Sequence, residues 1–120
     1  MEKPHKKLDV WKLSMDLVTE IYKITNNFPE KEIYCLTPQI RRAAISIPSN
    51  IAEGAARNTK REFVNFLHIA QGSLSELDTQ IEIAKRLDYL KENDWKSLDE
   101  MMIRIDKMLS GLVKQLKREA

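Results

Sequence analysis

The sequence has few of the residues that build turns, disulfides and metal sites. Its 120 residues include 3 glycines, 4 prolines, 2 histidines and a single cysteine, Cys35. So few glycines and prolines argue against a strand-rich fold, which needs many turns, and against a disordered chain. One cysteine cannot form an intramolecular disulfide or a cysteine-based zinc site. We therefore expect one compact domain, residues 1–120, in a reducing cytoplasm.

Long apolar runs and a strong charge bias are also absent. No window approaches the about 18 apolar residues that a membrane-spanning helix needs, and the start of the chain leads into no apolar core of signal-peptide length. Lysine and arginine number 20 against 18 acidic residues, a net charge of +2 that is no nucleic-acid signature by itself. The sequence predicts a soluble cytoplasmic protein without a membrane partner.

The sequence is rich in helical periodicity. Apolar residues return every three or four positions in four segments, and these predict helices at approximately 9–26, 38–57, 60–88 and 94–118. Such helices, joined by short connections and with no strand signal, predict an all-α, antiparallel up-down-up-down four-helix bundle.

Capping and breaking residues agree with these segments. Asn26–Pro29 should end the first helix, and Thr37 with Pro38 should start the second. Thr59–Glu62 has the spacing of a capping box, and Asn93 or Asp94 should cap the last helix. Within the second helix, Pro48 should kink or split it.

Two helical surfaces are candidates for self-association. The first helix carries two adjacent apolar stripes, which make its apolar face broader than one bundle core uses. The second helix is rich in small residues, mainly alanine and serine with Gly54, which let a neighbouring backbone come close. The two stripes are Val10, Leu17, Ile21, Ile24 and Trp11, Met15, Val18, Tyr22.

Catalytic and cofactor motifs are missing, so we predict no enzyme, no catalytic residue, no cofactor and no metal. A di-iron bundle needs Glu-x-x-His on two helices, and the sequence has this spacing once, at Glu2 and His5, before the first predicted helix; His68 does not follow a glutamate by three residues. No base is evident for Cys35. The three glycines form no phosphate-binding loop; Gly72 and Gly111 lie inside predicted helices, where close helix packing is the ordinary explanation.

Polar residues crowd the second and third helices. One of two neighbouring arginines, Arg41 and Arg42, is expected to meet Glu53 or Glu76 in a semi-buried salt bridge. Such a network would fix helix register or subunit contacts, while the alternative is a polar groove that binds a ligand. The residues of this predicted network are Gln39, Arg41, Arg42, Ser46, Asn50, Glu53, Ser73 and Glu76.

Basic residues cluster near both chain ends and between the second and third helices. In an up-down bundle these three places lie at one end, where they could form a positive surface for phosphate contacts. The alternative is a set of solvated helix ends, because the clusters lack aromatic residues for base stacking. A helix-turn-helix across Ile51–Leu67 is less consistent, because Arg57 falls where an apolar residue should be buried. The candidate nucleic-acid contacts are Lys6, Lys7, Arg57, Lys60, Arg61, Lys114 and Lys117.

Four segments closely resemble one bacterial family over about residues 5–115. They are Leu8–Trp11, Leu36–Gly54 (LTPQIRRAAISIPSNIAEG), Glu62–Phe63 and Ala70–Leu77. The family is the four-helix-bundle proteins also called 23S rRNA intervening-sequence proteins, first noticed inside insertions in bacterial 23S rRNA genes. Cys35 and Asp88 stand where relatives often have glycine, at positions where glycine allows a left-handed backbone.

The resemblance implies a homopentamer around a central channel, and no catalysis. The chain is also similar to the accessory protein of diversity-generating retroelements, a pentameric barrel that binds a reverse transcriptase and nucleic acid. The expected partners are therefore further copies of the chain and structured RNA or a nucleic-acid-handling protein. The alternative is a purely structural self-assembling scaffold without a nucleic-acid role.

Overall fold

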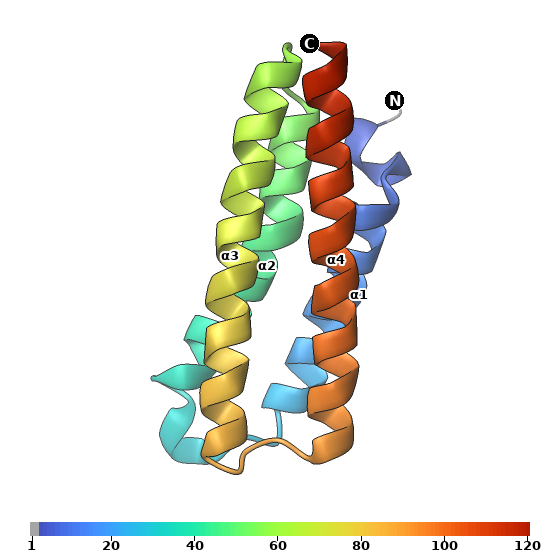
Figure 1. Cartoon of the computed structure of the whole chain (residues 1–120). Coiled ribbons are helices and arrows are strands. Elements are labelled where there is room, and N and C mark those ends of the chain that lie inside the picture. The colour runs from blue at the N-terminus through green and yellow to red at the C-terminus, as the bar shows by residue number, and fades with distance from the viewer. Residues whose placement is uncertain (1–2) are drawn as a thin grey trace.

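The computed structural model describes residues 3–120 as four long helices packed side by side (Figure 1). α1 lies against α2 and α4, and α3 lies against the same two helices, so successive helices run up and down around the bundle. The predicted all-α up-down bundle is confirmed. The helices are α1 (Asp9–Thr25), α2 (Leu36–Ala55), α3 (Lys60–Arg86) and α4 (Glu92–Glu119), with 3-10 turns η1 (Pro4–Lys7) and η2 (Glu30–Glu32).

The core is made by one apolar stripe from each helix. On α1 the first predicted stripe is buried, whereas the second is only half-buried, with Met15 40% and Tyr22 39% exposed. One bundle core therefore leaves part of the α1 apolar surface open, beside α2. Within residues 3–120 no helix is long and apolar enough to cross a membrane. The fully buried large residues are Leu17, Ile21, Ile40, Ile47, Ile51, Leu67, Leu77, Ile81, Leu98, Ile105 and Leu109.

α2 lies close to α3 at Gly54. A Cβ atom at Gly54 would lie 2.8 Å from both Phe63 Cδ1 and Phe66 Cβ, too close for any side chain. Gly72 and Gly111 have nothing within 4 Å of such an atom. Their assignment to close helix packing is therefore wrong within this chain, because both lie on exposed helix surfaces.

The N-terminus of α3 is capped as predicted. Thr59 Oγ1 accepts a hydrogen bond from the Glu62 backbone N–H at 3.1 Å, and its hydroxyl donates to the Glu62 carboxylate. α4, in contrast, begins at Glu92 with no side-chain cap, so the assignment of Asn93 or Asp94 as its cap is wrong.

The N-terminus of α2 is capped from outside the helix. α2 begins at Leu36, and Thr37 is buried inside its first turn, so the prediction of Thr37 as the cap is wrong. Instead, the Leu36 N–H donates to Glu32 Oε1 at 3.2 Å, and Tyr89 Oη donates to Glu32 Oε2 at 2.8 Å. A carboxylate is favourable here because it faces the positive end of the helix dipole.

The backbone geometry at Pro48, Asp88 and Cys35 tests three expectations from the sequence. Pro48 is buried within α2, which continues through it, so the helix is not split. Asp88 has φ 62°, which is the left-handed geometry expected there. Cys35 has φ −123°, so the same expectation is wrong for that residue.

We predict that Gly54→Ala destabilises the fold, because the new methyl group would press against Phe63 and the Phe66 Cβ. The expected loss in free energy of unfolding is about 1 to 3 kcal/mol. The matched control is Gly72→Ala, which should gain about 1 kcal/mol because alanine favours an exposed helix interior. Urea unfolding followed by circular dichroism measures both; equal effects of the two variants would contradict the close contact.

Candidate functional site

The basic segments lie together at one end of the bundle. η1, the end of α4 and the α2–α3 turn are toward the top of Figure 1, whereas the α1–α2 and α3–α4 connections are at the bottom. η1 brings Lys6 and Lys7 to this end, and Arg57 lies in the turn before α3. Lys114 and Lys117 lie on the last turns of α4. The structure thus brings the candidate nucleic-acid contacts to one end.

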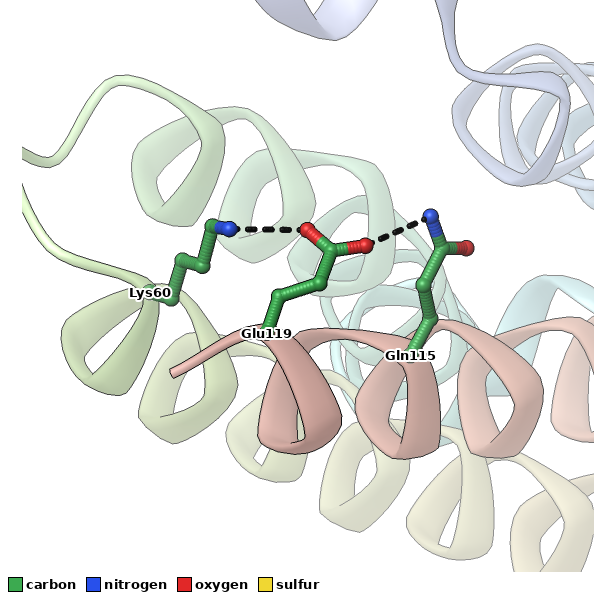
Figure 2. A network of polar contacts seen from close by, with 3 residues as sticks. All are labelled: Lys60, Gln115 and Glu119. Atoms are coloured by element: carbon green, nitrogen blue, oxygen red, sulfur yellow. Dashed lines mark hydrogen bonds and ion pairs between the residues drawn. The ribbon is translucent and has the colours of Figure 1, made fainter.

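Lys60 has a carboxylate partner (Figure 2). Its Nζ atom donates to Glu119 Oε1 at 2.8 Å, and Gln115 Nε2 donates to Glu119 Oε2 at 3.1 Å. The hydrogen bond from Lys60 lowers the pKa of Glu119, with a smaller contribution from Gln115. The pair joins the start of α3 to the end of α4 and neutralises the charge of Lys60, which reduces its value as a phosphate contact.

Several other cations at this end are exposed and free to bind an anion. Arg61, Lys114 and Lys117 are exposed and have no ion-pair partner among the residues that the structure describes. The Arg57 guanidinium lies over the Phe66 ring, 4.7 Å from its centre, which fixes the charge without neutralising it. These side chains can therefore contact an anionic partner without breaking an internal ion pair.

A small polar contact joins α2 to α3, as part of the predicted network. The hydroxyl oxygens of Ser46 and Ser73 lie 2.8 Å apart, and Asn50 Nδ2 donates to Ser46 Oγ at 3.0 Å. Glu76 accepts a hydrogen bond from Gln80 Nε2 at 3.2 Å on the same helix. The remaining predicted members Gln39 and Glu53 are exposed.

The predicted salt bridge from Arg41 or Arg42 to Glu53 or Glu76 is wrong. Arg41 turns to α1, where it donates to Thr25 Oγ1 at 2.9 Å and Asn26 Oδ1 at 3.0 Å and lies over the Tyr22 ring. The reason is helical geometry: five positions separate Arg41 from Ser46, a rotation of about 140°, so the two side chains face different neighbours. Arg42 is exposed.

A groove between α1 and α2 lies where the second apolar stripe of α1 is left open. Its volume is about 720 Å³. We call it the cationic groove, since Arg41 and Arg42 line it against one acid, Glu30. A second hollow of about 350 Å³, lined by Trp11, Met15 and Val18 among others, continues it past Ile45 along the same two helices. The apolar lining of the cationic groove includes Tyr22, Phe28, Ile33 and Ile45.

A second groove, between α3 and α4, carries the opposite charge. It measures about 320 Å³, and we call it the acidic groove because Asp78, Asp99 and Asp106 line it against one base, Lys107. Burial raises the pKa of Asp78, and the neighbouring carboxylates of Asp99 and Glu82 raise it further. Sequence reasoning missed this groove. Its one signal was the seven-residue spacing of Asp99 and Asp106, which places them on one helix face.

Residues with catalytic chemistry are dispersed. Cys35 is an exposed free thiol, and the exposed His68 has its Nδ1 3.2 Å from Gln71 Oε1. Across residues 3–120, no group of three or more histidine, cysteine or acidic side chains is arranged to hold a metal ion.

The fold defines an all-α up-down bundle, and comparison with known proteins gives its family. The model of the 23S rRNA-intervening sequence protein family matches residues 6–111, and the chain belongs to that family. The chain is also similar to a crystal structure of a protein with unknown function from the S23 ribosomal protein family from Bacteroides thetaiotaomicron VPI-5482. The two are 27% identical with a TM-score of 0.78, covering 88% of this chain and 98% of that one. No curated protein matches the chain.

We predict that the contribution of Asp78 to stability becomes more favourable as the pH falls through its raised pKa. The folded protein binds this proton at a higher pH than the unfolded chain, so the gain is absent well above the folded-state pKa and complete below the unfolded-state value. Asp78→Asn should lack this part of the pH dependence. Urea unfolding from pH 7 to pH 3, at a protein concentration where the midpoint no longer changes with dilution, measures both; identical pH profiles would refute the assignment.

Proposed function

We propose that this protein is a non-enzymatic, self-assembling bundle that binds structured RNA through its basic end. The observation that carries the proposal is the convergence of three basic segments on one end of the bundle (Figure 1). Phosphate contacts need such a concentration of lysine and arginine, which a net charge of +2 does not reveal. The family description, which refers to rRNA intervening sequences, supports RNA as the partner.

The chemistry of the basic end favours contacts to phosphates over contacts to bases. Phe66 lies on α3 with its ring beneath the Arg57 guanidinium, so that face of the ring is covered and cannot stack on a base. Lys60 neutralises the charge of the Glu119 carboxylate, whereas the Glu62 carboxylate accepts a hydrogen bond from the neutral Thr59 hydroxyl and keeps its charge. Recognition by backbone charge and shape, with a strong dependence on salt, follows from this composition.

The open surface along α1 and α2 supports self-assembly. Met15, Tyr22 and Ile45 are 39–41% exposed there, in the groove that one bundle leaves uncovered. Further copies of the chain would cover it, and the homopentamer implied by the family resemblance is the assembly that we propose. The same groove supports the second candidate function, a structural scaffold without a nucleic-acid role.

The test is a titration of a structured RNA hairpin at several salt concentrations. We expect affinity to fall steeply with salt, and Lys114→Glu/Lys117→Glu to weaken binding. Each lost phosphate contact should flatten the slope of log K against log salt by about 0.7 to 0.9. The matched control, Lys91→Glu/Arg104→Glu, makes the same charge change away from the basic end and should bind like the wild type.

Two results would contradict RNA binding at this end. One is salt-independent binding or none, and the other is an equal loss in both double variants. An assembled protein that does not bind RNA would favour the structural scaffold.

A further inference from the structure

The cationic and acidic grooves lie on opposite faces of the bundle. α1 and α2 form one of them, and α3 and α4 form the other. Because the helices follow one another around the bundle, these two pairs face away from each other. A copy placed beside the molecule can therefore bring one groove against the other.

The charges of the cationic groove are not neutralised within the chain. The four partners of Arg41 are a hydroxyl, an amide oxygen, a backbone carbonyl and an aromatic ring, none of which carries a formal charge. Arg42 has no hydrogen-bond or ion-pair partner among residues 3–120. Glu30, the one acid in the lining, forms no ion pair with either arginine.

The acidic groove has more negative charges than positive ones, the opposite of the cationic groove. Asp78 and Asp99 repel each other, and Asp106 lies in the same groove, so three carboxylates are present against the single base Lys107. Ile103 lies among them and is 48% exposed. In the cationic groove Ile45, 41% exposed, lies in the turn after the two arginines. Each groove therefore combines uncompensated charge with an open isoleucine.

The two sets of charges lie at the same height along the bundle. The contact between Ser46 and Ser73 gives a common level for α2 and α3. Arg42 lies four residues before Ser46, about 6 Å along α2, and Asp78 lies five residues after Ser73, about 7.5 Å along α3. Because the helices are antiparallel, both displacements have the same direction. A copy can therefore meet its neighbour without sliding along the bundle axis.

We propose that the cationic groove of one copy docks against the acidic groove of a second copy. This head-to-tail contact rests on the self-assembly in the proposed function and specifies its interface. Arg41 and Arg42 of one molecule face the aspartates of the next, while Ile45 and Ile103 supply the apolar centre. Matching heights allow neighbouring copies to be related by a rotation about an axis parallel to the bundle, and such a contact closes a ring when the rotation is a whole fraction of a turn.

The test is charge reversal in the full chain, followed by sedimentation velocity over a range of protein concentrations. Arg42→Glu and Asp78→Lys are suited to it: Arg42 has no partner to lose, and Asp78→Lys relieves the repulsion from Asp99. Each variant should weaken association at least about tenfold. Arg42→Glu/Asp78→Lys restores opposite charges across every contact and should recover association. Arg104→Glu, outside both grooves, is the matched control and should assemble like the wild type.

Every other outcome overturns the proposal in a recognisable way. If the wild-type protein stays monomeric, both self-assembly and the proposed interface are contradicted. If the oligomer persists in both single variants, self-assembly stands and the proposed interface is contradicted. Single variants that dissociate without recovery in the double variant show that the two grooves do not meet.

Discussion

The close contact between α2 and α3 is the constraint on which the rest of the structure depends. Gly54 lets Phe63 and Phe66 lie directly on the α2 backbone. Farther along the same helix, the buried residues Ala43 and Ala44 also have small side chains. Packing of this kind leaves no room for even one added methyl group. It fixes the start of α3 against the end of α2, next to the turn that carries Arg57.

The same contact sets the relation between the two side grooves. Ser46 meets Ser73 between α2 and α3, and this register places Arg42 level with Asp78 on the outer surfaces. A shift of one helical turn, about 5.4 Å, would move the cations and the aspartates apart. A nearly neutral chain is thus divided into a basic end, a cationic groove and an acidic groove, which total charge does not reveal.

The fold was predictable because the spacing of apolar residues along the sequence indicates the buried face of each helix. The basic end was predictable as well, since up-down topology dictates which segments meet. The direction of Arg41 and the cap from Glu32 were not, because both depend on contacts between segments far apart in the chain. The acidic groove was missed for a similar reason: Asp78 joins Asp99 and Asp106 only after α3 and α4 have packed.

The most direct test of this account is chemical cross-linking between Ile45→Cys and Ile103→Cys in a Cys35→Ser background. Ile45 and Ile103 lie in opposite grooves, so the two new thiols of one molecule are kept apart by the bundle. With a short bis-maleimide, the double-cysteine protein should form a ladder of covalent multimers, and neither single-cysteine protein should cross-link. Dimers from one single-cysteine protein, or no ladder from the double variant, would contradict the head-to-tail arrangement of opposite charges.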